Sequence, residues 1–178
     1  MSKSAILVID VQIGLVTGAH KESAVIKAIN KTISKIRDDS GIVVFIQHCH
    51  SSYEPLMRGN AEWRLHPDLA KSSSDLVIEK EASDAFYETQ LDKLFKENNV
   101  EHLFVTGLQT EFCVDTTCRA ALSRGYSITL VSDGHTTGDS HLPAETIIDH
   151  HNKVLANLAH PKARLYVKTS NELSNNLY

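Results

Sequence analysis

Short apolar runs, each followed by a helix-like segment, are the feature that most constrains the fold of this chain. Residues 4–9 (SAILVI) form an almost continuous apolar run, which is typical of a strand buried on both faces of a parallel sheet. Further strands are predicted at residues 42–47, 75–79, 101–106, 126–131 and 163–167. Because strands and helices alternate along the chain, we expect a parallel sheet with helices on both faces and right-handed crossovers.

The predicted helices support this arrangement. Residues 23–37 place an isoleucine or valine at every third or fourth position, the spacing of one helix face. Residues 89–92 (TQLD) resemble a capping box that opens a helix ending near Asn98, and Pro143 opens another helix. The predicted fold class is therefore α/β, a three-layer α/β/α arrangement with about six mainly parallel strands. The 178 residues show no repeat or linker, so we expect one domain over residues 1–178.

Composition limits the classes of partner. A net charge of −4 without a block of basic residues argues against nucleic acid and anionic membranes. No apolar run reaches transmembrane length, and the N-terminal run is too short for a signal peptide. The three cysteines, Cys49, Cys113 and Cys118, form no CxxC motif, which fits a reducing compartment. We therefore expect a cytoplasmic protein whose partner is a small-molecule substrate.

The main candidate for chemistry is Cys113. It lies between the predicted strand at 101–106 and a predicted helix at 114–122, and Thr110 is placed to cap that helix. In the first turn of a helix, a thiol meets unpaired backbone N–H groups and the positive end of the helix dipole, which lower its pKa. This stretch alone leaves two interpretations open, a nucleophile or a small residue of a buried helix.

Two charged residues fall on the same edge of the predicted sheet as Cys113. Ligands of such sheets bind beyond the carboxyl ends of the strands, where Asp10 and Lys80 follow the first and third strands. Asp10 could take the proton of Cys113 and later return it to a leaving group, while Lys80 stabilises both charges. N–H groups near Cys113 could hold the oxyanion of acyl transfer. Taken singly, Asp10 is equally consistent with a turn residue and Lys80 with a surface lysine.

These residues resemble the isochorismatase-like cysteine hydrolases, which include nicotinamidases. The resemblance rests on Asp10, Lys80 and residues 107–114 (GLQTEFCV), and it spans nearly the whole chain. It implies a catalytic triad of Asp10, Lys80 and Cys113, with an oxyanion hole formed by the N–H groups of Gln109 and Cys113. It also implies a cis peptide between Leu108 and Gln109, a Rossmann-like fold, and a homodimer or homotetramer.

One departure from the family bears on cofactor and substrate. Nicotinamidases carry an Asp-x-His metal site after the second strand, where residues 47–50 here are QHCH and lack the aspartate. We expect His48 and His50 to point to opposite faces of the strand, and we therefore expect no metal and no other cofactor. The loop at 56–67 resembles that of smaller, functionally unassigned cysteine hydrolases. The predicted substrate is a small amide, lactam or ureido compound, with nicotinamidase or isochorismatase activity as alternatives.

Five side chains are candidates for the substrate pocket: Gln12, His48, Trp63, Phe86 and Phe112. Each has a structural alternative, because Gln12 could hold the loop after Asp10 and the aromatic residues could belong to the core. We expect Cys118 to be a core residue.

Two other classes of function were weighed. A nucleotide-binding module needs a glycine-rich phosphate loop after the first strand, and residues 10–14 (DVQIG) contain neither GxGxxG nor a P-loop. A thiol redox sensor would use a low-pKa Cys113, but no CxxC partner is present. The set of Asp10, Lys80 and Cys113 therefore favours a hydrolase that works through a thioester, and the family resemblance implies that it acts on carbon–nitrogen bonds other than peptide bonds.

Overall fold

The computed structural model describes residues 3–174, which are built around a six-stranded sheet in the order β3-β2-β1-β4-β5-β6. All five strand pairings are parallel. The strands are β1 (Lys3–Ile9), β2 (Ile42–His48), β3 (Leu76–Lys80), β4 (Val100–Gly107), β5 (Ser127–His135) and β6 (Leu165–Lys168). The six predicted strands are confirmed, but β5 continues four residues beyond the predicted end, to His135.

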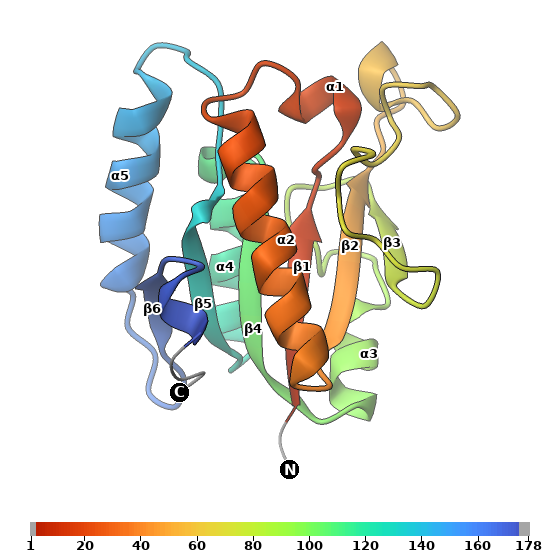
Figure 1. Cartoon of the computed structure of the whole chain (residues 1–178). Helices are drawn as coiled ribbons and strands as arrows, with labels where there is room; N and C mark the ends of the chain where they lie inside the picture. The colour runs from red at the N-terminus through yellow and green to blue at the C-terminus, as the bar shows by residue number, and fades with distance from the viewer. Residues whose placement is uncertain (1–2, 175–178) are drawn as a thin grey trace.

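Helices cover both faces of the sheet (Figure 1). They are α1 (Ile13–Val16), α2 (Glu22–Asp38), α3 (Leu91–Glu97), α4 (Asp115–Ser123) and α5 (Ala144–Ala156). Short turns of 3-10 helix lie at η1 (Glu54–Leu56) and η3 (Glu172–Ser174), and a π-helical turn, η2 (Thr110–Val114), precedes α4. The predicted three-layer α/β/α class is confirmed.

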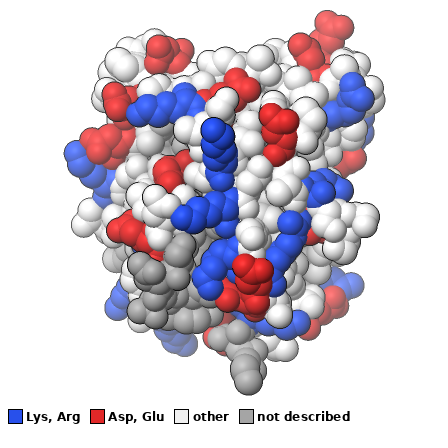
Figure 2. Space-filling view, viewed as in Figure 1, with Lys and Arg blue, Asp and Glu red and all other residues white. Residues whose placement is uncertain are grey.

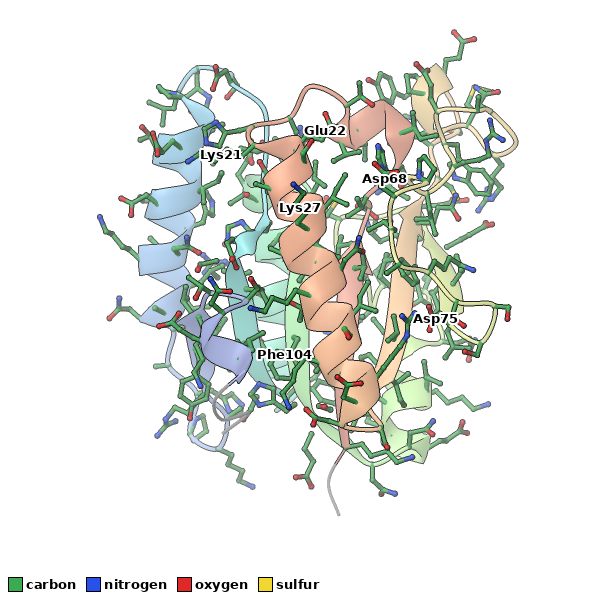
Figure 3. The ribbon with its side chains drawn as sticks, viewed as in Figure 1. Lys21, Glu22, Lys27, Asp68, Asp75 and Phe104 are labelled. Carbon is green, nitrogen blue, oxygen red and sulfur yellow. The ribbon has the colours of Figure 1, made fainter. Side chains whose placement is uncertain are left out.

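Each face of the sheet has its own hydrophobic core, because successive strand residues point to opposite faces. Ile6 and Val8 of β1 pack with α2, whereas Leu7 and Ile9 pack with α3, α4 and α5. Figure 3 labels Phe104 of β4 in the layer beneath α2, where it is almost fully buried. Burial on both faces explains why residues 5–9 of β1 and 103–105 of β4 are all apolar.

Two predicted helix caps are wrong, although both helices form close to their predicted positions. Helix α3 begins at Leu91 after Gln90, and the hydroxyl of Thr89 donates to the carbonyl of Ala85 at 2.7 Å instead of forming a capping box. Thr110 does not cap the cysteine helix, because it lies inside η2 and its hydroxyl bonds to His135. In both places the side chain that the local pattern assigned to the cap bonds to a partner outside the helix, and Thr89 in addition accepts from the N–H of Leu91 at 3.4 Å.

The strand order places the candidate residues. The chain adds β2 and β3 on one side of β1 and then crosses to β4 on its other side, so β1 and β4 are neighbours at the point where the order reverses. Ligands of open α/β sheets bind in the crevice at this point. The long loop between β2 and β3, which contains residues 56–67, lies beside the carboxyl end of β1, where Leu65 forms a bridge with Gln12.

Charged residues of both signs are spread over the face of the molecule shown in Figure 2. On the face shown in Figure 2, basic residues along the middle are interspersed with acidic residues on both sides. Within residues 3–174, none of the helices combines the length and the apolar character needed to cross a bilayer.

Candidate active site

Asp10, Lys80 and Cys113 meet at the carboxyl edge of the sheet. The Nζ atom of Lys80 lies 2.8 Å from Oδ2 of Asp10 and 3.2 Å from Sγ of Cys113. Asp10 directly follows β1, Lys80 is the last residue of β3, and Cys113 lies in the η2 turn that follows β4. The three residues therefore come from three different strands, and the side chain of Lys80 reaches past the end of β2 to join the other two.

A left-handed backbone turn aims Asp10 into the site. Its φ is +53°, a conformation that aspartate tolerates better than most residues, and its N–H donates to the carbonyl of Ile46 at 3.0 Å. The residue is 1% exposed. The carboxylate is thus held at the end of β1 by the neighbouring strand β2.

Gly107 begins the loop that carries the nucleophile candidate. Its φ is +113°, and a Cβ at this position would lie 1.9 Å from the carbonyl oxygen of Ile9. The next N–H, that of Leu108, donates to the same oxygen at 2.8 Å, and the predicted cis peptide between Leu108 and Gln109 is present. Only glycine lets β4 approach β1 this closely, and the loop then delivers Cys113 above β1.

The ammonium group of Lys80 lies at the centre of the site. Its side chain is fully buried, and besides Asp10 and Cys113 its Nζ contacts Nδ1 of His48 at 2.8 Å and the carbonyl of Ala82 at 3.0 Å. Four acceptors thus surround an ammonium that has three hydrogens. Lys80 is therefore not a solvated surface lysine, and its charge is directed at Asp10 and Cys113.

The same contacts bear on metal binding. One ligand atom each from Asp10, His48 and Cys113 lies within 4.8 Å of the others, a grouping that resembles a metal site. However, the ammonium of Lys80 is bonded to all three side chains and takes the central position of a cation. This donor set does not fit a metal ion while Lys80 is charged.

Burial shifts the pKa values of the two candidate proton carriers upward. Desolvation raises the pKa of Asp10, although the charge of Lys80 acts in the opposite direction. Desolvation and then the Asp10 carboxylate raise the pKa of Cys113 to about 12, against the opposing effect of Lys80. The predicted lowered pKa of Cys113 is therefore wrong, because desolvation and the Asp10 charge outweigh the effect expected from the helix start. At neutral pH, Cys113 is a thiol beside an ionisable carboxylate.

His48 and His50 have different environments. His48 ends β2, and burial together with Lys80 lowers its pKa to about 4, so it is neutral at pH 7 and accepts from Lys80 through Nδ1. His50 is exposed, and its Nδ1 accepts from the N–H groups of Ser52 and Tyr53. The strand argument that we used for their separation is wrong, because alternate residues of a strand share a face. They have different surroundings because β2 ends at His48.

Gln12 fastens the long loop to the sheet. Its Nε2 donates to the carbonyls of His48 at 3.0 Å and Trp63 at 2.7 Å, while its Oε1 accepts from the N–H of His48 at 2.8 Å. Since the side chain is fully buried and all its polar atoms are used, this geometry supports the loop-holding interpretation.

The aromatic candidates lie in different surroundings. Phe86 packs in the core, stacked on Tyr126 at a centroid distance of 5.9 Å, whereas Phe112 is 54% exposed beside the nucleophile candidate. The pocket roles of Trp63, Phe86 and Phe112 stay predictions. Cys118 is fully buried in the core, as predicted.

Sequence reasoning missed two features next to the site. The carbonyl of Ala82 bonds to Lys80, and no side-chain pattern signals a backbone acceptor. His135 bonds to Thr110, and it escaped notice because the predicted strand ended at Val131. A histidine four residues beyond the predicted end of that strand was the available signal.

Comparison with known proteins defines the class. The family model "Isochorismatase domain" matches residues 4–167, so the chain belongs to the isochorismatase family of hydrolases, as the residues predicted. A solved isochorismatase family protein is 33% identical with a TM-score of 0.81, covering 91% of this chain and 96% of that one.

Two relatives carry more specific names. The chain is 30% identical to streptothricin hydrolase of Streptomyces noursei over 76% of its own length and 55% of that protein, so it spans about half of this curated relative. It is 26% identical to the solved N-carbamoylsarcosine amidase from Thermoplasma acidophilum, with a TM-score of 0.76 and coverage of 95% and 97%.

Proposed function

We propose that this protein is a cysteine hydrolase that cleaves a carbon–nitrogen bond of a small amide, lactam or ureido compound through a thioester on Cys113. The observation that carries the proposal is the fully buried Lys80, whose ammonium bonds to both the Asp10 carboxylate and the Cys113 sulfur. Streptothricin hydrolase and N-carbamoylsarcosine amidase support this substrate class by their names, since N-carbamoylsarcosine is a ureido acid.

In the first half of the reaction, the sulfur of Cys113 attacks the carbonyl carbon while its proton passes to Asp10. The raised pKa of Asp10 makes this carboxylate a stronger base than an exposed aspartate. The carbonyl oxygen takes the electron pair as an oxyanion. When the tetrahedral intermediate collapses, Asp10 returns the proton to the nitrogen, the C–N bond breaks, and the acyl group stays on Cys113 as a thioester.

In the second half, water attacks the thioester and Asp10 takes a proton from that water. The C–S bond then breaks, the acid leaves, and the proton returns to the sulfur of Cys113. Lys80 keeps the site close to neutral throughout, because its positive charge compensates Asp10 before each proton transfer and the thiolate or oxyanion afterwards.

The N–H groups of Gln109 and Cys113 are proposed to hold the oxyanion. Among residues 3–174, no acceptor is bonded to the N–H of Gln109, which keeps this donor available for a developing charge. Gln109 directly precedes the η2 turn that contains Cys113, so donor and nucleophile belong to one short loop.

A redox role is less well supported. Peroxide sensing needs an exposed thiolate, whereas Cys113 is buried and its pKa is raised. The assembly state also belongs to the proposal: we expect a homodimer or homotetramer, which light scattering of the purified protein would measure.

The test is hydrolysis of a panel of small amides, lactams and ureido acids by the wild type, Cys113→Ala and Cys118→Ala. Cys118 is a matched control, since it is a second buried cysteine, five residues after Cys113, and belongs to the core. We expect Cys113→Ala to lose at least about 10³-fold in kcat/KM. Cys118→Ala should keep its activity, and a chelator should have no effect. Turnover that survives Cys113→Ala would overturn the proposal.

A further inference from the structure

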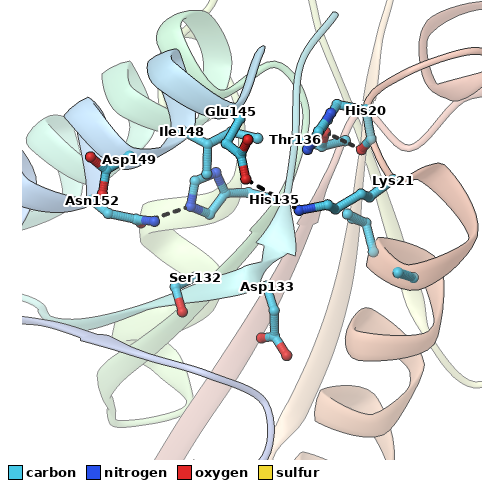
Figure 4. Close-up of a pocket in the computed structure, with 12 residues that line it drawn as sticks. His20, Lys21, Ser132, Asp133, His135, Thr136, Glu145, Ile148, Asp149 and Asn152 are labelled. Carbon is cyan, nitrogen blue, oxygen red and sulfur yellow. Dashed lines mark hydrogen bonds and ion pairs between the residues drawn. The ribbon is translucent and has the colours of Figure 1, made fainter. Parts of the chain in front are cut away.

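The nucleophile loop is held from the side opposite to Asp10 by a buried histidine that the reaction itself does not use. His135, the last residue of β5, is 1% exposed. Its Nδ1 lies 2.9 Å from Oγ1 of Thr110, and its Nε2 lies 3.0 Å from Oδ1 of Asn152 on α5. Figure 4 shows His135 between α5 and the start of α2, with its bond to Asn152.

The direction of each hydrogen bond follows from the partners. The carbonyl oxygen of Asn152 can only accept, so Nε2 of His135 carries the hydrogen. Burial lowers the pKa of His135 to about 4, so the ring is neutral and Nδ1 is an acceptor. The hydroxyl of Thr110 therefore donates to Nδ1, and this bond fixes its rotation.

The two residues after His135 hold the same loop through further bonds. Thr136 donates its N–H to the carbonyl of Gly107 at 3.1 Å and accepts from the N–H of Thr110 at 3.0 Å. The hydroxyl of Thr137 donates to Glu111 at 3.0 Å. Residues 135–137 thus form hydrogen bonds to residues on both sides of Gln109, namely Gly107 before it and Thr110 and Glu111 after it.

A cavity lies next to His135 and its partner Asn152. It has a volume of about 370 Å³ and is lined by His135, Thr136 and Asn152 among others, but by no residue of the loop at 107–114 (Figure 4). The ion pair of Lys21 with Glu145, at 3.5 Å, links the residue before α2 to α5 at this cavity. Leu108 and Thr110 are fully buried, so the loop is held by packing as well as by the directed hydrogen bonds from residues 135–137.

We propose that His135 is a positioning residue that acts through the hydroxyl of Thr110 to hold the Gln109 N–H where the oxyanion forms. The inference rests on the proposed function. It follows from geometry, because an oxyanion-hole donor works only within about 2.7–3.1 Å of the oxygen. A displacement of about 1 Å at a reacting centre costs about 100-fold in rate.

A second buried pair of a histidine and a threonine, away from the nucleophile loop, serves as a control for the pair of His135 and Thr110. His102 and Thr129, on β4 and β5, form a bond of 2.8 Å between Nε2 and Oγ1, and both residues are buried. Burial lowers the pKa of His102 to about 4 as well. This pair lies toward the amino ends of the strands, away from the loop, so Thr129→Val removes a similar hydrogen bond without touching the site.

The test compares two reactions of Cys113. Acylation by p-nitrophenyl acetate passes through an oxyanion, whereas alkylation by iodoacetamide displaces iodide and forms none. We expect Thr110→Val to slow acylation about 10- to 100-fold and to change alkylation by no more than about twofold. Thr110→Ser, which keeps the hydroxyl, should recover acylation to within about threefold of the wild type. Thr129→Val should change neither rate.

The other possible results overturn either the positioning role of His135 or the proposed function. Equal loss of both rates in Thr110→Val, no loss of acylation, or no recovery in Thr110→Ser would overturn the positioning role alone. If Thr110→Val does not fold, His135→Gln takes its place with the same expected difference between the two rates. Acylation that is absent in the wild type, or that persists in Cys113→Ala, would overturn the proposed function and this inference with it.

Discussion

Replacing Gly107 with alanine should disrupt the junction of β1 and β4 that supports the site. The added Cβ would lie 1.9 Å from the carbonyl oxygen of Ile9 and 2.6 Å from its nitrogen, and both are backbone atoms of the central strand. Backbone strain at a φ of +113° costs about 1–3 kcal/mol, and forced overpacking adds about 1–3 kcal/mol. We therefore expect Gly107→Ala to lower the free energy of unfolding by about 2–6 kcal/mol.

Gly125→Ala separates the cost of backbone strain from the cost of overpacking. Gly125 also has a positive φ, +91°, but an added Cβ there meets nothing within 4 Å. Its cost is left-handed strain of about 1–2 kcal/mol, partly offset by about 0.4–1 kcal/mol from a less flexible unfolded chain. Urea unfolding followed by circular dichroism measures both variants. Equal costs for the two substitutions, or a loss below about 1 kcal/mol for Gly107→Ala, would refute the close approach of β4 to β1.

Three further perturbations test other parts of the structure. Lys80→Met removes the cation between Asp10 and Cys113, so kcat/KM should fall by at least about 100-fold, and a smaller loss would contradict the electrostatic role. Gln12→Ala breaks three side-chain bonds and should cost about 2–4 kcal/mol of unfolding free energy, whereas a loss below about 1 kcal/mol would show that the loop is held elsewhere. Three histidines have a pKa lowered from 6.5 to about 4, so the unfolded chain binds more protons in this range and stability should fall as the pH decreases from about 6.5 to about 4. The three residues are His48, His102 and His135. The urea concentration at the midpoint of unfolding should decrease as the pH is lowered across this range, and a midpoint that does not change with pH would contradict the prediction.

The sheet could be predicted from the sequence because its central strands are buried on both faces. Residues 5–9 are apolar at every position because they lie between two helical layers, and this leaves a continuous run rather than an alternating one. The meeting of Asp10, Lys80 and Cys113 also followed, since the carboxyl ends of parallel strands share one edge.

The errors fall where a distant partner decides the outcome. Thr110 has the residue type of a helix cap, but its hydroxyl bonds to His135, which lies 25 residues later in the sequence. The pKa of Cys113 depends on burial and on Asp10, neither of which follows from its place near a helix start. Local patterns therefore predicted the strands and main helices, but they assigned the hydroxyls of Thr89 and Thr110 to the wrong partners.

The central claim is a covalent intermediate on Cys113, and mass spectrometry of the acid-quenched enzyme tests it directly. An active amide from the substrate panel is mixed with wild-type protein and with Cys113→Ala, and the intact mass and the peptide containing residue 113 are measured. The wild type should gain the mass of the acyl group on Cys113 within the first turnover, and Cys113→Ala should gain none. An active wild-type enzyme that hydrolyses the amide with no acyl adduct, or with the adduct on another residue, would contradict thioester catalysis by Cys113.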